Sequence, residues 1–171
     1  PGPARNLGVA HSSGEVLAFI DADCLAGPEW LEDAALAMAD PAAQVLGGDV
    51  RIAYADPARL TALEAYESIY AYRMDRYIAR EGFTGTGNLV VRRAVLHRVG
   101  PFGGLDVADD RDWGQRSPAM GEVIRSIPGM KRYPPARQAM SRLVQKLDRT
   151  MHPALTRARA PPSRPWPRRA Q

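Results

Sequence analysis

Two aspartates, Asp21 and Asp23, directly follow an unbroken apolar run over 16–20. The run has the length of a strand, and in an α/β sheet ligands collect outside the carboxyl ends of the strands. Side chains two residues apart at a strand end point the same way, and neighbouring carboxylates repel unless a cation or proton lies between them. A divalent ion completed by diphosphate oxygens is the natural partner, although an isolated Asp-x-Asp pair also fits a turn cap beside a solvated side chain.

A second acidic run contains Asp106, Asp109, Asp110 and Asp112. It enters a segment, 105–116, that we expect to be helical. Asp109 has an alternative role as a helix cap, and Asp112 in the first turn would favour the helix dipole and pair with Arg116 one turn on. Arg116 therefore has two interpretations, a phosphate ligand or a partner of Asp112.

A glycine-rich turn separates two predicted elements in the middle of the chain. Its residues are Thr84, Gly85, Thr86, Gly87 and Asn88. Glycines allow the backbone to approach a ligand closely, but a plain tight turn explains them equally well.

Helices and strands that could position these groups follow from hydrophobic spacing. We expect a short helix that stops at Gly14, strands over 16–20, 44–54, 89–91 and 123–127, helices over 28–41 and 57–82, and a brief helix before Gly100. The strand over 16–20 is expected to be buried on both faces of a parallel sheet. The helix over 57–82 carries a stripe at helical spacing, expected to pack inside: Leu60, Leu63, Tyr66, Tyr70, Met74 and Tyr77.

The composition indicates one globular domain with a tail. The 171 residues are 45% hydrophobic and 25% charged, and no apolar run approaches the roughly 20 residues that span a bilayer. The lone Cys24 excludes an internal disulfide framework and fits a reducing cytoplasm. The net charge of +4 is concentrated after Lys131, without an aromatic-basic platform. We therefore expect a cytoplasmic protein that binds no nucleic acid, with a peripheral contact to the inner face of the membrane through the basic C-terminus as a further expectation.

The order of these motifs resembles family 2 glycosyltransferases. The matching residues are Ala4-Arg5-Asn6-x-Gly8, Ser13-Gly14-Glu15, Leu17-Ala18-Phe19-Ile20-Asp21-Ala22-Asp23 and Pro28-Glu29-Trp30-Leu31. Later blocks are Gly85-Thr86-Gly87-Asn88-Leu89-Val90-Val91, Val99-Gly100-Pro101-Phe102 and Asp109-Asp110-Arg111-Asp112-Trp113. The resemblance extends from Pro3 to about Arg137.

The resemblance implies an α/β fold, a partial GT-A three-layer sandwich with a mixed, mostly parallel sheet that lacks its opening strands. It also implies an inverting, metal-dependent transfer of a sugar from a nucleotide-sugar donor to a glycan, lipid-linked or small-molecule acceptor. Asp21 and Asp23 would hold Mn²⁺ or Mg²⁺ and the diphosphate, with Arg5 on the donor side. Asp110 would be the general base. The expected acceptor-side residues are Gly85, Thr86, Gly87, Asn88, Asp109 and Trp113, with packing as an alternative for Trp113.

The resemblance assigns 1–136 to the C-terminal part of the catalytic domain. Apolar spacing predicts an amphipathic helix over 137–156, and the composition of 157–171 predicts a basic, disordered Pro/Arg-rich tail. Within 128–137 the family tends to place a His, whereas this sequence has Tyr133-Pro134. The Gln-x-x-Arg-Trp motif of processive members is not seen, which favours one sugar per encounter. The alternatives are a non-catalytic remnant or interaction module, and a metal-dependent phosphoryl-transfer enzyme.

Overall fold

The computed structural model describes residues 1–104 and 109–137, apart from the side chains of Asp109 and Asp110. The elements in chain order are α1 (Gly2–His11), β1 (Val16–Ile20), β2 (Leu25–Ala26), α2 (Trp30–Met38), β3 (Val45–Val50), α3 (Ala62–Tyr70), α4 (Met74–Arg76), the π-helix η1 (Tyr77–Glu81), β4 (Asn88–Arg92), α5 (Arg93–Val99), α6 (Asp109–Ala119) and β5 (Ile124–Tyr133). The predicted helix over 137–156, beyond Arg137, and the predicted tail over 157–171 lie outside the described residues.

The five strands form one sheet in the order β1-β4-β3-β5-β2. The sheet is mixed, as predicted, but the expectation that it is mostly parallel is wrong. Among the described strands only β3 and β5 pair in parallel, while β1·β4, β3·β4 and β2·β5 are antiparallel. Strand β4 lies between β1 and β3 and is antiparallel to both. The prediction failed because an apolar run indicates that a strand is buried but not in which direction it runs.

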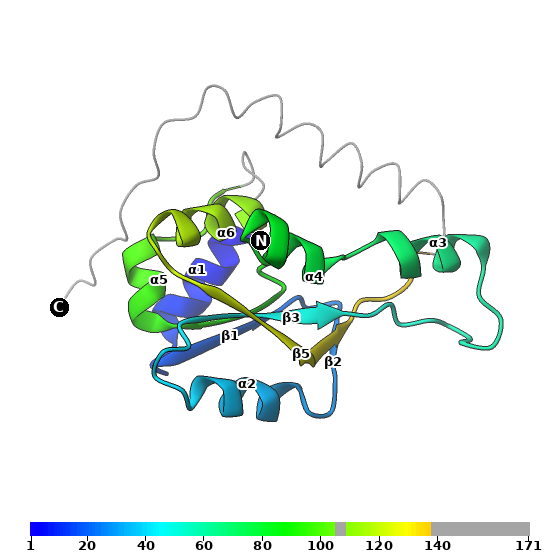
Figure 1. Ribbon diagram of the computed structural model, residues 1–171, viewed down its shortest axis with the longest axis horizontal. Helices are drawn as coiled ribbons and strands as arrows, with labels where there is room; N and C mark the ends of the chain where they lie inside the picture. The colour runs from blue at the N-terminus through cyan, green and yellow to red at the C-terminus, as the bar shows by residue number, and fades with distance from the viewer. Residues whose placement is uncertain (105–108, 138–171) are drawn as a thin grey trace, which may run out of the picture.

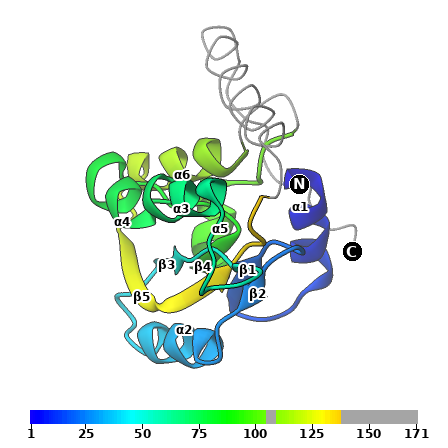
Figure 2. The same ribbon diagram turned by 90° about the vertical axis from the view of Figure 1, so that its right-hand side faces the viewer.

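Helices cover both faces of the sheet and make three layers (Figures 1 and 2). Helix α2 covers one face, where it packs on strand residues in an apolar cluster: Trp30, Ala34, Met38, Ala43, Leu46, Val90 and Met130. Helices α1, α5 and α6 cover the other face, with a second cluster: Val9, Leu17, Val45, Leu89, Val91, Val95, Leu96, Val99, Phe102, Trp113 and Ile124. Successive residues of β3 and β4 alternate between the two clusters, because strand side chains point to opposite faces in turn.

Strand β1 has the predicted bounds but not the predicted burial. Leu17 is buried, whereas Val16 and Ile20 remain 38% and 39% exposed. The strand lies at one end of the described sheet, paired on one side with β4. Its position in the strand order, which the local pattern does not encode, leaves part of its surface uncovered.

The segment between β3 and β4 departs most from expectation. The single helix predicted over 57–82 is broken into α3, α4 and η1. The break lies at Tyr72, whose φ of 54° is in the left-handed region that side chains other than Gly rarely adopt. Gly82 ends η1 with a φ of 63°, as a helix-terminating glycine is expected to do.

Strand β5 is longer than the predicted strand over 123–127 because it contains a bulge. Gly48 pairs with Ile127, but the next residue of β3, Asp49, pairs with Lys131. Pro128, Gly129 and Met130 have no partner residue on β3 in this register. A Pro-Gly pair normally indicates the end of a strand, which is why the second half of β5 was not predicted.

Other predicted elements agree with the structure. Helix α2 and helix α5 lie within the predicted segments, and α6 continues past Arg116 to Ala119. Within the part of the chain that the structure describes, no helix is long and apolar enough to cross a membrane.

Candidate functional site

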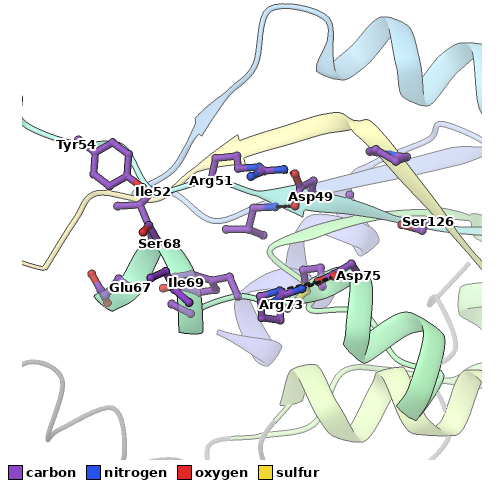
Figure 3. Close-up of a pocket in the computed structure, with 16 residues that line it drawn as sticks. Asp49, Arg51, Ile52, Tyr54, Glu67, Ser68, Ile69, Arg73, Asp75 and Ser126 are labelled. Atoms are coloured by element: carbon purple, nitrogen blue, oxygen red, sulfur yellow. Dashed lines mark hydrogen bonds and ion pairs between the residues drawn. The ribbon is translucent and has the colours of Figure 1, made fainter. Parts of the chain in front are cut away.

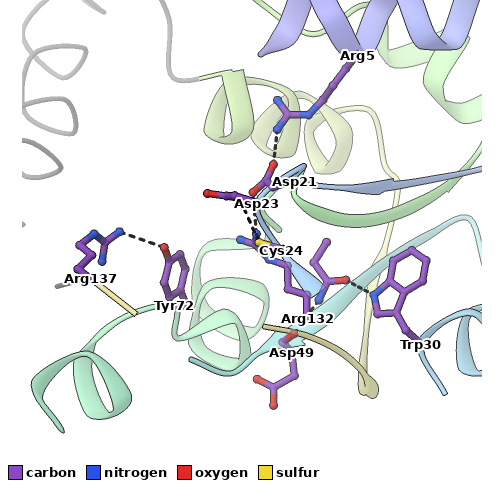
Figure 4. A network of polar contacts seen from close by, with 10 residues as sticks. Arg5, Asp21, Asp23, Cys24, Trp30, Asp49, Tyr72, Arg132 and Arg137 are labelled. Atoms are coloured by element: carbon purple, nitrogen blue, oxygen red, sulfur yellow. Dashed lines mark hydrogen bonds and ion pairs between the residues drawn. The ribbon is translucent and has the colours of Figure 1, made fainter. Parts of the chain in front are cut away.

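The two predicted metal-binding aspartates lie together in the turn after β1 (Figure 4). The backbone N–H of Cys24 donates to the carbonyl of Asp21 at 3.0 Å, which folds the turn. As a result, one ligand atom each from Asp21, Asp23 and Cys24 lie within 4.8 Å of one another. Two carboxylates at this spacing suit a hard divalent cation, so the residues present fit the ion that the resemblance implies.

Gly87 lies against this cluster, where a side chain would displace the Asp21 carboxylate. A Cβ atom at Gly87 would lie 2.0 Å from Oδ2 of Asp21, well inside van der Waals contact. In the structure, the group that the glycine turn approaches at Gly87 is the Asp21 carboxylate. Thr86 beside it is fully buried.

Two arginines hold the Asp21 carboxylate. Arg5 donates to Oδ1 at 2.9 Å and Arg132 donates to Oδ2 at 2.7 Å. Arg5 was expected on the donor side of the site, whereas Arg132 was missed. Arg132 comes from the second half of β5, 111 residues from Asp21, and no local motif indicates that contact.

Arg132 is also fixed by its other neighbours. The same Nη1 donates to Sγ of Cys24 at 2.9 Å, and the guanidinium lies 5.6 Å from the centroid of the Tyr72 ring. Its side chain is only 8% exposed, and its Nε is buried with no hydrogen-bond partner among the described residues. Burial raises the pKa of the Cys24 thiol to about 11, although the Arg132 charge opposes that rise. Cys24 therefore presents a protonated thiol near neutral pH.

A polar chain continues from Arg132 to α3 through Tyr72 (Figure 4). Arg137 donates to the Tyr72 hydroxyl at 3.1 Å and forms an ion pair with the buried Glu67. Burial is the main reason that the pKa of Tyr72 is raised. The broken helix segment is thus connected to the aspartate cluster by charged and aromatic groups.

Three residues expected on the acceptor side have buried side chains, namely Thr86, Asn88 and Trp113. The Asn88 amide donates to the carbonyls of Asp49 and Met130 at 2.8 and 2.9 Å, and its oxygen accepts from Trp30 Nε1 at 2.7 Å. Asn88 therefore joins β3, β5 and α2. Trp113 is fully buried, and its Nε1 donates to the Gly100 carbonyl at 3.0 Å, which is the packing alternative.

The acidic run at the start of α6 is described only in part. Asp109 and Asp110 begin the helix, but their side chains lie outside the described residues. Asp112 pairs with Arg116 at 2.9 Å, and Arg116 also donates to the carbonyls of Val99 and Pro101. For Arg116 the structure thus supports the role of partner of Asp112.

A cavity of about 470 Å³ lies between the end of β3 and the α3–α4 segment (Figure 3). Two guanidinium–carboxylate pairs line it, Arg51 with Asp49 and Arg73 with Asp75, each at 2.7 Å. Tyr72 lines the cavity as well and so connects it with the aspartate cluster. Its mixture of donors and acceptors suits a polyhydroxyl ligand better than an apolar one.

Comparison with known proteins relates this chain to glycosyltransferases. The pattern of glycosyl transferase family 2 matches residues 1–100. Glycosyltransferase AglE of Haloferax volcanii is 36% identical over 119 residues, which are 69% of this chain and 38% of the relative. The chain therefore spans well under half of that relative's length.

Solved structures share the fold at low sequence identity. The mannosyltransferase PcManGT from Pyrobaculum calidifontis, in complex with GDP-Man and Mn²⁺, matches with a TM-score of 0.62 at 20% identity, over 96% of this chain and 45% of that one. TarS 1-349 of S. aureus, in complex with UDP-GlcNAc, gives 0.58 at 20%, over 81% and 40%. Glucosyl-3-phosphoglycerate synthase from Mycobacterium tuberculosis, in complex with Mn²⁺ and UDP-Glc, gives 0.55 at 16%, over 95% and 56%. The predicted α/β fold of the GT-A class is confirmed.

Proposed function

The chain belongs to glycosyl transferase family 2, and from that premise we propose that it transfers a sugar from a nucleotide-sugar donor to an acceptor hydroxyl. One observation carries the proposal. Ligand atoms of Asp21, Asp23 and Cys24 gather within 4.8 Å at the carboxyl end of β1, where an α/β sheet places its ligands. The related structures that contain nucleotide sugars support the same donor class.

Asp21 and Asp23 are the proposed ligands of a divalent cation, Mn²⁺ or Mg²⁺. Such an ion supplies neutralisation of the charge that develops on a departing diphosphate. Arg5 is proposed to contact the diphosphate end of the donor, because its guanidinium lies 2.9 Å from Asp21 Oδ1. Complexes of the related structures with Mn²⁺ support the choice of a divalent ion.

Asp110 is the proposed general base of a single, inverting displacement. Its carboxylate takes the proton of the acceptor hydroxyl while that oxygen bonds to the anomeric carbon, and the bond from that carbon to the diphosphate breaks. Asp110→Asn keeps the shape and removes the basicity, so turnover should fall by about 10² to 10⁴-fold with little change in donor affinity. If Asp110→Asn kept near-normal transfer while Asp109→Asn or Asp112→Asn lost it, the general base would be reassigned to the residue whose variant is inactive.

The acceptor is proposed to be a glycan, a lipid-linked sugar or a small hydroxyl compound, in polysaccharide or glycoconjugate biosynthesis. The polar cavity beside Tyr72 supports an acceptor rich in hydroxyls. The glycine turn over Gly85, Thr86 and Gly87 is still proposed to lie on the acceptor side of the site. Contact with an anionic membrane surface is proposed for the basic segment after Lys131 of a cytoplasmic protein. Co-sedimentation with phosphatidylserine vesicles at low and high salt tests that contact.

Metal binding is the direct test of the proposed site. Asp21→Asn with Asp23→Asn removes both carboxylates, so Mn²⁺ binding measured by titration calorimetry should disappear. The control is Asp40→Asn with Asp56→Asn, which removes the same charge from surface positions outside the site. Equal Mn²⁺ affinity in both double variants would remove the metal role from Asp21 and Asp23.

A further inference from the structure

The Asp21 carboxylate already has cationic partners on both oxygens. Arg5 lies 2.9 Å from Oδ1 and Arg132 lies 2.7 Å from Oδ2. Together with Asp23, these four side chains have a formal charge of zero. A divalent ion that binds alone to Asp21 and Asp23 would raise the formal charge of this cluster, with its two guanidinium groups included, to +2.

Arg132 cannot easily move away from an incoming cation. Its side chain is 8% exposed, its Nη1 contacts Cys24 Sγ at 2.9 Å, and its guanidinium lies over the Tyr72 ring. Like charges within a few ångströms in a poorly solvated site repel strongly. The repulsion between Arg132 and the ion therefore persists in the metal-bound protein.

The unpartnered Nε of Arg132 points to an anionic ligand. A buried N–H of a charged group without an acceptor is costly and uncommon in folded proteins. The guanidinium is a planar fork that matches phosphate oxygens, and it stands beside the carboxylate that would hold the ion. An oxygen of a diphosphate bound with the ion would supply the missing acceptor.

We propose that Arg132 is a built-in counter-ion of Asp21 that opposes binding of the divalent cation alone and binds the donor diphosphate, so that cation and diphosphate bind to this site together. The proposal rests on the proposed glycosyl transfer at the same site. The diphosphate offsets the excess positive charge that the cation brings. Arg132 thereby disfavours binding of the cation without the donor and favours binding of the cation together with the donor diphosphate.

Arg132→Gln separates the two effects because they have opposite signs. Mn²⁺ alone, followed by loss of its free-ion electron paramagnetic resonance signal, should bind about tenfold more tightly, a usual size for coupling between bound groups. The Mn²⁺–pyrophosphate complex, measured by titration calorimetry, should bind roughly 10- to 100-fold more weakly, as expected for loss of a charge-assisted hydrogen bond.

Two further variants control for charge and shape. Arg132→Lys keeps the charge but loses the fork, so Mn²⁺ alone should bind as in the wild type and the pyrophosphate complex should bind with intermediate affinity. Arg125→Gln removes the same charge from the same strand at its exposed pair with Asp40, and it should change neither affinity. Thermal unfolding monitored by circular dichroism establishes that each variant is folded.

The outcomes distinguish this proposal from the one on which it rests. Unchanged or weaker binding of Mn²⁺ alone by Arg132→Gln overturns the counter-ion role, while Mn²⁺ binding that still requires Asp21 leaves the metal site intact. Unchanged binding of Mn²⁺–pyrophosphate by Arg132→Gln overturns the diphosphate contact. If no variant binds Mn²⁺ with or without pyrophosphate, the metal site of the proposed function fails together with this inference.

Discussion

Helices α2 and α3 have nine residues each but bury opposite kinds of side chain. Helix α2 buries Trp30, Ala34 and Met38 against the sheet. Helix α3 buries the carboxylates of Glu64 and Glu67 and leaves Tyr66 and Tyr70 48% and 65% exposed.

The difference follows from what each helix covers. Helix α2 lies over finished strands whose apolar side chains have no other cover, so hydrophobic periodicity predicts its inner face. Helix α3 lies beside the polar network of Arg137 and Tyr72, and its buried carboxylates have polar partners: Glu67 pairs with Arg137, 70 residues away, and Glu64 bonds to Thr61 at the start of the helix. A helix that frames a site can therefore reverse the pattern that holds for a helix that covers a core.

The largest expected effect is in α2. Trp30→Ala removes a 6%-exposed side chain and its hydrogen bond to Asn88, so the free energy of unfolding should fall by about 3 to 5 kcal/mol in urea titrations. Leu31→Ala, at a neighbouring position that is 67% exposed, should change it by less than about 0.5 kcal/mol. Similar losses for the two variants would mean that α2 does not bury the face described.

The matching change in α3 should have a somewhat smaller effect. Glu67→Gln leaves Arg137 without its buried partner, and unfolding free energy should fall by about 2 to 3 kcal/mol. Adding Arg137→Gln should recover part of that loss in a double-mutant cycle. Glu81→Gln is the control, since its pair with Arg111 is exposed and should contribute at most about 1 kcal/mol. A cycle with no coupling would show that charge does not hold α3.

The two helices also begin differently. Thr61 caps α3 in a capping box with Glu64, whereas Glu29 at the start of α2 makes no side-chain cap. Thr61→Ala should therefore cost about 1 kcal/mol of unfolding free energy, and Glu29→Ala much less. Equal losses in chemical denaturation would remove the distinction between the two starts.

Acid should weaken α3 through the same capping box, with the smallest effect of the series. The backbone N–H of Thr61, and then its hydroxyl, hold the pKa of Glu64 below its usual range. Because the pKa is lower in the folded state, this stabilisation is present above the unfolded-state pKa of about 4.3 and is lost as pH falls through the lowered value. The difference in urea midpoint between wild type and Glu64→Gln should thus shrink as pH falls from about 5 through the lowered pKa of Glu64. Glu32→Gln in α2 is the matched control, and a difference that does not shrink on acidification would contradict the assignment.

Local sequence patterns predicted the elements whose environment is simple. An apolar run predicted the bounds of β1, and helical spacing predicted the helix around Trp30. The glycine at position 82 predicted the end of the helical segment before it. The strand directions were not predictable, because the direction of β4 depends on a chain path that no short window contains. The exposed Tyr66 and Tyr70 had helical spacing and still lie outside, since Glu67 and Arg137 determine the inner face.

The clustering of the candidate site residues was predictable where they are close in sequence. Asp21 and Asp23 follow β1 directly, and Arg5 belongs to the same run of motifs. Arg132 was not predictable, because it reaches Asp21 from 111 residues away by a strand that continues after a Pro-Gly pair. For Asn88 and Trp113, the motif indicated important positions, but the three-dimensional hydrogen bonds show that their side chains join elements of the protein.

The bulge in β5 also sets how far along β3 the residues after it lie. At about 3.3 Å per residue, the three unpaired residues between Ile127 and Lys131 would carry an unbroken strand roughly 10 Å further along β3. The bulge takes up that length and sets Arg132 opposite Val50, within reach of Asp21. Because the unpaired residues of a bulge do not shift the paired ones, the pairing that resumes after it, Lys131 with Asp49 and Arg132 with Val50, fixes the place of the arginine.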